Sequence, residues 1–254
     1  MGAMSDVSRL GPYRLLKPLR PSDLCERWRA VHEVERTSHV VHRFQLSKLG
    51  ITPRAFLEAV ERAAGVREAH VLEIEKFCLA EPGWACAVTP YTGSADGLLP
   101  LSTLLEAKGG QASPIEGERT ALQLLAASIA GAEAGVAHGP IAMDDVLVDR
   151  HGRLLIEFYG LRAMLLAQRT GPEFVRDEVR SIAEITYRVV TGVAPSEPRI
   201  RAGRLVRKLE KRFDNWLESG LSPTLGFASA AEALDSLRPE REAVITLRSA
   251  PARA

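Results

Sequence analysis

The sequence predicts an α+β protein with two lobes, a small β-rich lobe that carries one helix and a larger lobe that is mainly helical. Three observations predict this fold class. Short runs of β-forming residues fill the first third of the chain, one helical stripe interrupts them, and the apolar spacing becomes helical after Gly93. We expect residues 1–9 to be an extension, 10–91 the first lobe, 92–247 the second and 248–254 a disordered tail.

The first lobe is expected to be a strand meander with one helix inside it. Runs of β-formers, separated by Pro, Gly, Ser and charged residues, predict strands over 13–19, 26–32, 39–46, 71–74, 77–80 and 84–91. Between the third and fourth runs, Thr52 is a good N-cap and Pro53 suits the first helical position. The apolar residues that follow have helical spacing, which predicts a helix after Thr52.

The second lobe is expected to begin with a long buried helix. Ser113 and Glu116 form a capping-box pattern with Pro114 at the first helical position, and apolar residues then recur at helical spacing. Two short strands are predicted within 146–156, around an Asp-Arg-His-Gly turn. Further helices are predicted over 177–191, 202–217 and 229–238.

Composition excludes several classes of protein. The 33 Lys and Arg nearly balance the 32 Asp and Glu, so the whole-chain charge of +1 predicts neither a nucleic-acid partner nor an anionic membrane surface. No apolar run is long enough to span a bilayer. Cys25, Cys78 and Cys86 are odd in number and lack metal-ligand spacing, which favours buried thiols in a reducing compartment, by default the cytoplasm, over a disulfide framework or a structural metal.

One stretch identifies a family resemblance. Residues 135–141 read Gly-Val-Ala-His-Gly-Pro-Ile, and residues 145–153 read Asp-Val-Leu-Val-Asp-Arg-His-Gly-Arg. Together they resemble the G-V-x-H-R-D-L and N-V-L-V-D-x-x-G-R patterns of bacterial serine/threonine protein kinases. The resemblance covers nearly the whole chain, from Leu10 to Leu234, and implies the two-lobed kinase fold.

The resemblance also shows where the expected nucleotide-binding groups are replaced. A working kinase cradles the nucleotide phosphates with a glycine-rich loop, and these glycine positions fall on Arg20, Ser22 and Cys25. The phosphate-binding lysine of the third strand falls on His42, with Arg43 one residue later. The resemblance therefore implies that this chain lacks the phosphate cradle and the lysine.

The catalytic loop of the family is altered as well. Its catalytic aspartate and metal-binding asparagine fall on Pro140 and Asp145. The helix glutamate that pairs with the lysine falls on Glu61 by one spacing and on Ala59 by another. Thr89 takes the position behind the nucleotide pocket.

The metal-binding Asp-Phe-Gly motif of the family falls on Phe158, Tyr159 and Gly160. A shift of one residue would place Glu157 at the metal-binding position, but it would leave Tyr159 in place of the glycine. Only 20 positions separate Phe158 from Glu178 in the next predicted helix, so the segment that would hold a peptide substrate is short.

These replacements imply a pseudokinase, an inactive kinase-like module that binds another protein. Such a module is not expected to bind ATP and magnesium productively or to use another cofactor. The alternative is a nucleotide-sensing or transferase domain that holds ATP without metal through Arg20, His42 or Arg43. One dense basic run, over 199–212, could dock an acidic partner, although a solvated helix face is the more economical interpretation.

Overall fold

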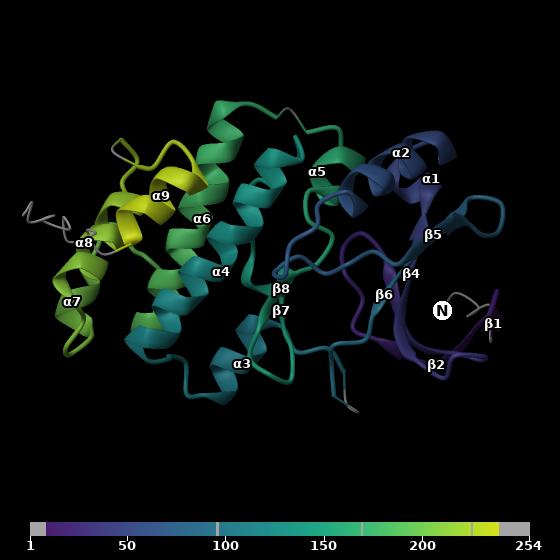
Figure 1. Cartoon of the computed structure of the whole chain (residues 1–254), viewed down its shortest axis with the longest axis horizontal. Helices are drawn as coiled ribbons and strands as arrows, with labels where there is room; N and C mark the ends of the chain where they lie inside the picture. Colours follow the sequence, from purple (N-terminus) through teal and green to yellow (C-terminus); the bar gives the residue numbers. More distant parts are fainter. Residues whose placement is uncertain (1–8, 95–96, 169, 225, 239–254) are drawn as a thin grey trace, which may run out of the picture.

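The computed structural model describes residues 9–94, 97–168, 170–224 and 226–238. Within these ranges the chain forms two lobes, with a sheet at one end and helices at the other (Figure 1). The predicted two-lobed α+β architecture is confirmed. The proposed disordered tail, 248–254, lies outside the described residues.

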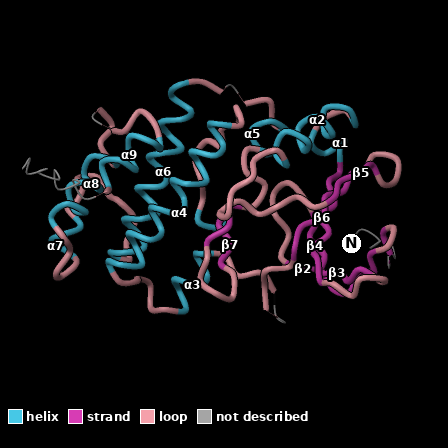
Figure 2. The backbone as a smooth tube through the Cα atoms, viewed as in Figure 1, coloured by secondary structure: helices cyan, strands magenta, loops and turns pink. Residues whose placement is uncertain are grey.

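The first lobe is built on an antiparallel sheet of six strands in the order β1-β2-β3-β4-β6-β5 (Figure 2). The strands are β1 Arg9–Leu10, β2 Tyr13–Leu19, β3 Glu26–His32, β4 Ser38–Gln45, β5 Lys76–Leu79 and β6 Trp84–Pro90. Five of the six predicted strands are therefore present within one residue of their expected ends. The sequence analysis missed β1, which begins inside the proposed extension.

Two helices accompany this sheet, α1 Leu46–Leu49 and α2 Pro53–Ala64. The predicted cap of α2 is confirmed, because the Thr52 hydroxyl accepts a hydrogen bond from the Ala55 N–H at 3.2 Å. The buried face of α2 packs on the sheet through Phe56, Ala59, Val60 and Ala63.

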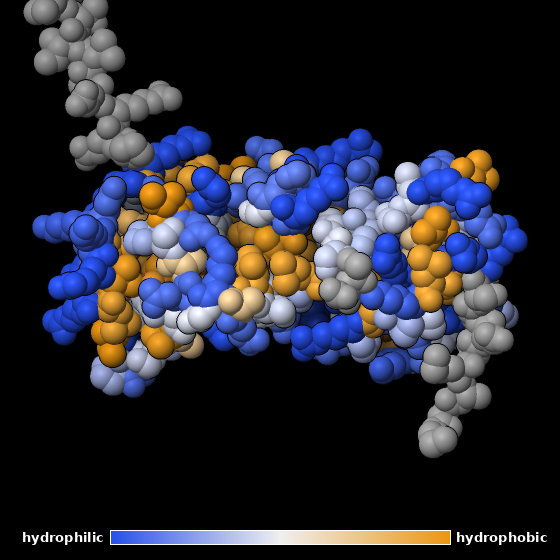
Figure 3. All heavy atoms as spheres, turned by 90° about the horizontal axis from the view of Figure 1, so that it is seen from below, coloured by the Kyte–Doolittle hydropathy of each residue, from blue (hydrophilic) through white to orange (hydrophobic). Residues whose placement is uncertain are grey.

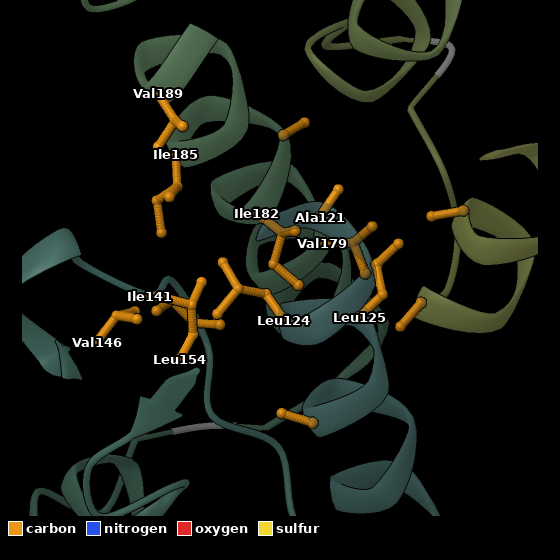
Figure 4. Close-up of a cluster of buried hydrophobic side chains, with 14 of the residues drawn as sticks. Ala121, Leu124, Leu125, Ile141, Val146, Leu154, Val179, Ile182, Ile185 and Val189 are labelled. Atoms are coloured by element: carbon orange, nitrogen blue, oxygen red, sulfur yellow. The ribbon is translucent and has the colours of Figure 1, made fainter. Parts of the chain in front are cut away.

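The second lobe is organised around two long helices, α4 and α6. Its elements are α3 Leu101–Ala107, α4 Pro114–Glu133, the 3-10 turn η1 Met143–Asp145, β7 Val146–Val148, β8 Leu154–Ile156, α5 Leu161–Leu165, α6 Pro172–Thr191, α7 Ala202–Leu205, α8 Lys211–Gly220 and α9 Ala230–Leu237. Leu124 and Leu125 of α4 pack toward Val179 and Ile182 of α6 in a fully buried core (Figure 4). The capping box at Ser113 is confirmed.

Three sequence predictions of the local structure were wrong. Residues 71–74 form no strand, and only Val71 makes an isolated bridge to Ile156. Helix α6 begins at Pro172 rather than at 177, with Gly171 as its N-cap. The helix predicted over 202–217 is two helices, because Lys208, between α7 and α8, has the left-handed φ of 63°.

A short segment of each lobe packs against the other lobe. Residues 70–72 bond to β8 of the second lobe, with hydrogen bonds from Leu72 N–H to the Ile156 carbonyl and from Ile156 N–H to the His70 carbonyl. In the other direction, Leu161 and Leu165 of α5 join the core between α2 and the sheet. Each lobe thus buries a segment that the chain order assigns to the other, which holds the lobes together.

Candidate functional site: the cleft between the lobes

A cavity of about 390 Å³ lies between the lobes. It is lined by the loop between β2 and β3, by β3, by the segment 138–145, by residues 157 and 158, and by α5. A larger hollow, of about 890 Å³, lies between α4, α5 and α9, but of the predicted site positions its walls contain only Tyr159, whereas Arg20, Ser22, Pro140, Asp145 and Phe158 line the smaller cavity. The smaller cavity is therefore the candidate site.

The loop between β2 and β3 uses its own backbone donors. The Ser22 hydroxyl accepts hydrogen bonds from Leu24 N–H at 3.3 Å and Cys25 N–H at 3.2 Å, and Ser22 N–H donates to the Cys25 carbonyl at 3.1 Å. Pro21 has no N–H to offer. Backbone N–H groups that a phosphate cradle would need are therefore bonded within the loop, and Arg20, its first residue, is exposed.

His42 of β4 is fully buried beneath the cleft. Its Nε2 lies 3.0 Å from the Thr89 hydroxyl, and its Nδ1 lies 3.8 Å from the Cys25 Sγ. Burial lowers the pKa of His42 well below its usual value, and the nearby Arg27 lowers it further. His42 is therefore neutral at physiological pH, and with Thr89 it forms a closed polar pair.

Arg43 does not point into the cleft. Neighbouring residues of a strand face opposite sides of the sheet, so Arg43 lies on the side away from His42. Its guanidinium lies 4.5 Å from the centre of the Trp84 ring and 3.5 Å from the Glu26 carboxylate. The structure thus separates the two residues that the sequence offered as alternatives for the lysine position.

Phe158 fills the space between β4 and α2. Its ring centre lies 4.5 Å from that of His42 and 5.6 Å from that of Phe44, both at steep angles. The backbone of Phe158 has a φ of 51°, a conformation that is costly for a bulky residue. Packing in the buried cluster offsets this cost.

Helix α2 brings no acidic group to this space. Ala59 belongs to the buried cluster that contains Phe158, whereas Glu61 is exposed on the other face of the helix. The structure therefore favours Ala59 as the residue that faces the cleft, and the alternative spacing to Glu61 is not supported.

An ion pair spans the cleft from lobe to lobe. The Arg27 guanidinium of β3 bonds to the Glu157 carboxylate, just after β8, and their side chains are only 10% and 4% exposed. Burial raises the pKa of Glu157 to about 7, although Arg27 opposes this shift. The second carboxylate oxygen of Glu157 lies 4.0 Å from His42 Nε2 and has no hydrogen-bond partner among the described residues.

The remaining catalytic-loop positions face the same cavity. Pro140 is exposed at its edge. Asp145 accepts a hydrogen bond from Ala142 N–H at 3.1 Å, which closes the turn η1, and Asp144 accepts one from the Ser102 hydroxyl. Within the described ranges no group of three His, Cys, Asp or Glu side chains could hold a metal ion.

Below the cleft, a buried carboxylate holds the loop in place. Glu178 of α6 accepts hydrogen bonds from His138 N–H at 2.8 Å, from Gly139 N–H at 3.0 Å and from the Tyr159 hydroxyl. The Tyr159 ring also packs on the His138 ring at 5.3 Å. Both carboxylate oxygens of Glu178 are therefore satisfied.

Gly160 begins the short segment that connects the cleft to α6. Its φ is 71°, and a Cβ atom there would lie 2.3 Å from a methyl group of Val136, so no other residue fits without rearrangement. Residues 161–165 then form α5, which packs beside α2 (Figure 1). Helix α5 thus takes up five residues of the short connection between Gly160 and Pro172, the first residue of α6.

Sequence reasoning missed two residues of this site. It gave no role to Arg27, although the spacing G-x-G-x-x-G-x-V of kinases puts Arg27 where a valine is expected. Register explains its position, because Arg27 pairs directly with His42 on the neighbouring strand and shares its face. It used Glu178 only as a helix marker, and nothing in the sequence distinguished this glutamate from the exposed ones.

Comparison with known proteins finds structures only. The kinase domain of PknI from Mycobacterium tuberculosis aligns with 93% of this chain and 98% of its own, at a TM-score of 0.70 and 16% sequence identity. A mutant of that domain aligns over the same shares, with a TM-score of 0.71 and 16% identity. No protein-family model and no curated protein sequence matches this chain.

This likeness establishes the fold. Because it spans nearly all of both chains, the two lobes together form one protein-kinase-like fold, as the sequence resemblance implied. None of the helices in the described part of the chain is long and apolar enough to cross a membrane.

Proposed function

We propose that this chain is a pseudokinase, a kinase-like module without phosphotransfer activity that acts by binding another protein. The observation that carries the proposal is that the chain's own side chains occupy the positions where the family holds nucleotide phosphates and metal. Phe158 fills the space under β4, and the Arg27–Glu157 ion pair crosses the cleft.

The chemistry supports the absence of a phosphate site. A kinase needs a cation on the strand, and here that position carries a neutral, fully buried imidazole. It needs free backbone donors in the loop, and here Ser22 and Cys25 consume them. Loss of one well-placed stabilising group typically costs about 10²–10³ in rate, so several losses together leave no useful activity.

Pro140 and Phe158 weigh against rescue by a partner. Neither side chain can accept a proton or bind a metal ion. Asp145 remains, but it caps the turn η1. A group supplied from outside would also have to displace the Phe158 ring from its buried cluster.

A thermal-shift titration tests the proposal. The purified protein is titrated with ATP and ADP, with and without magnesium or manganese, because a ligand that binds only the folded state raises the melting temperature. We expect no shift at millimolar nucleotide, and no transfer of labelled phosphate to the protein itself or to a general acceptor protein. A saturable shift, or phosphate transfer lost on Asp145→Ala, would contradict the proposal.

An Arg27→Ala variant serves as the matched comparison, since it removes the ion pair from the cleft. If nucleotide raises the melting temperature of neither protein, the missing phosphate cradle explains the lack of binding. If it raises that of the variant alone, the ion pair blocks binding, and the proposed inactivity of the natural chain still stands.

A second candidate function is metal-independent nucleotide binding for sensing or for an unusual transfer reaction. The observation that favours it is the cavity of about 390 Å³, which Arg20, Arg27 and Arg162 line from three different elements. Two of these cations are already paired, Arg27 with Glu157 and Arg162 with Asp23 at 3.5 Å. This candidate requires a shift without metal that Arg20→Ala abolishes.

The cellular location and the process in which the protein acts are part of the same proposal. We infer a cytoplasmic bacterial signalling role, because the three free cysteines suit a reducing compartment and the fold resembles that of a bacterial kinase domain. Cys25 and Cys86 are buried as predicted, but the prediction was wrong for Cys78, which is exposed because its strand lies at the edge of the sheet.

A further inference from the structure

Positive charge is concentrated in one short segment at the end of the molecule opposite the sheet. Residues 199–212 contain seven Arg or Lys and one Glu, a net charge of +6, while the whole chain carries only +1. The remaining residues together therefore carry −5. This segment spans α7 and the start of α8, at the far end of the helical lobe from the cleft (Figure 1).

The structure divides these seven cations into two groups. Arg199, Arg201 and Arg212 are ion-paired, with Glu218 at 3.5 Å, Asp214 at 3.0 Å and Glu118 at 2.7 Å. The others are Arg204, Arg207, Lys208 and Lys211, which are exposed and form no ion pair within the described residues. Four exposed cations within residues 204–211 thus have no ion-pair partner among the described residues.

Local stability does not explain these free cations. Lys211 is the first residue of α8, where the positive end of the helix dipole disfavours a cation, and the N-cap Glu210 makes no side-chain capping bond. Lys208 has a φ of 63°, which only glycine adopts without cost. Residues that are unfavourable for the local backbone or helix, as Lys208 and Lys211 are, often occur at functional surfaces.

A mixed polar and apolar hollow, with one exposed apolar side chain at its wall, adjoins the cations. Leu205 is 44% exposed, and with Val206 and Arg207 it lines a hollow of about 680 Å³ against the start of α4. Glu116, the acidic residue in its wall, is held by Lys108 and the cap at Ser113, which lower its pKa to about 2. In Figure 3, hydrophilic side chains project beside a strip of hydrophobic ones at this end of the molecule.

We propose that the basic surface formed by Arg204, Leu205, Arg207, Lys208 and Lys211 docks an acidic peptide segment of a partner protein, with one apolar side chain seated beside Leu205. This deepens the proposed function, because it names the docking surface of that module and the chemistry of its partner. Four free cations beside the exposed Leu205, with Arg207 in the wall of the hollow, match a short acidic segment with one aliphatic residue.

Nucleic acid and anionic membrane are less well matched. Both present extended arrays of negative charge, and the rest of the chain, at −5, would repel an array longer than this surface. Nucleic acid would also be expected to stack on aromatic side chains, and the exposed residues of the basic surface are aliphatic and cationic.

Fluorescence anisotropy with defined probes tests the proposal. The probe is a labelled peptide of glutamates around a central leucine, and the same peptide with serine in place of leucine is the paired probe. We expect saturable binding of the leucine peptide that weakens several-fold when salt is raised from low to physiological strength or above. Leu205→Ser should weaken binding of the leucine peptide and leave the serine peptide unchanged.

The charge requirement has a matched control. The triple variant Arg204→Glu/Arg207→Glu/Lys211→Glu should bind the leucine peptide at least about tenfold more weakly, because each substitution replaces a cation that attracts the peptide with an anion that repels it. Arg14→Glu/Lys48→Glu/Arg67→Glu changes net charge equally at exposed sites elsewhere and should bind as the natural chain does. Circular dichroism and urea denaturation confirm that both triple variants are folded.

Three outcomes would overturn the inference. These are no binding of the leucine peptide, equal loss of binding in both triple variants, and tighter binding of single-stranded oligonucleotide or phosphatidylserine vesicles than of the peptide. The nucleotide titration is a separate readout, so the basic surface can fail while the pseudokinase proposal stands, and the reverse also holds.

Discussion

Two buried glutamates, one in the cleft and one beneath it, differ in how fully their carboxylate oxygens are hydrogen-bonded. Glu178 of α6 receives three donors and has both carboxylate oxygens filled. Glu157 in the cleft has one partner, Arg27, and an oxygen that no described residue satisfies. The two side chains are almost equally buried, at 1% and 6% exposed for the whole residue.

The difference shows what each region does in the molecule. A buried charge with all its hydrogen bonds made is a structural anchor, and here it fixes the loop at His138 and Gly139. A buried ion pair with an open oxygen offers little net stability, because desolvation cancels much of the attraction. Glu178 therefore stabilises a loop of the helical lobe, while the Arg27–Glu157 ion pair occupies the cleft and adds little to the free energy of unfolding.

The largest expected effect is at Glu178. Glu178→Ala leaves two N–H groups and one hydroxyl without partners, and we expect it to lower the free energy of unfolding by about 5 kcal/mol. Urea denaturation followed by circular dichroism measures this. Glu184→Ala, on the same helix but partly exposed, should change stability by only about 0.5 kcal/mol. Equal losses in the two variants would break the comparison.

Next in size is the ion pair of the cleft. Arg27→Met and Glu157→Leu should each destabilise by about 3 kcal/mol, because the first leaves the buried Glu157 carboxyl without its hydrogen-bond partner and the second leaves the Arg27 charge unpaired. The double variant should lie within about 1 kcal/mol of the natural chain, since an apolar pair replaces an ion pair. A double variant as unstable as the two single changes added together would mean that Glu157 is as well satisfied as Glu178.

The pH dependence of stability sharpens the same contrast. The pKa of Glu157 is raised from 4.5 to about 7, so the unfolded chain loses this proton first as pH rises. The free energy of unfolding should therefore fall between about pH 4.5 and about pH 7, by up to about 3 kcal/mol, relative to the Arg27→Met/Glu157→Leu variant. Parallel stability profiles for the two proteins would show that Glu157 is ionised throughout.

The smallest effect isolates one donor of the anchor. Tyr159→Phe removes the hydroxyl that bonds to Glu178 and should cost about 2 kcal/mol, the range for a hydrogen bond to a charged group. Tyr187→Phe is the control, because its hydroxyl donates to the neutral Ile200 carbonyl at 2.7 Å. It should cost about 1 kcal/mol. A reversed order would mean that the bond to Glu178 contributes less than the bond to a backbone carbonyl.

Local signals in the sequence were enough for most of the elements. Proline and capping residues at Thr52 and Ser113 mark helix starts that the structure confirms, because a cap satisfies backbone donors within a few residues of itself. The strand at 71–74 was wrong for a related reason. Val71 and Leu72 are buried against β7 and β8 of the other lobe, and Ile74 lies in the core of the first lobe, so these residues are buried without a strand partner and leave the same sequence pattern.

The candidate site was less accessible to sequence reasoning. Counting along the chain located His42, Phe158 and Pro140, and the structure places Pro140 and Phe158 in the cavity wall with His42 packed on the Phe158 ring. It offered Arg43 as an alternative, yet strand alternation turns Arg43 to the other side of the sheet. It also left Ala59 and Glu61 open, which only the orientation of α2 could decide.

The sequence by itself determined the two-lobed α+β class and the kinase-like motif order, because these depend on residue identity and spacing. Only the tertiary structure decided that Arg27 meets Glu157, 130 residues later, and that Phe158 enters the core of the first lobe. It also decided which cations of residues 199–212 are free. Such contacts depend on how distant segments pack together, and a residue type carries no information about which partner the fold will bring to it.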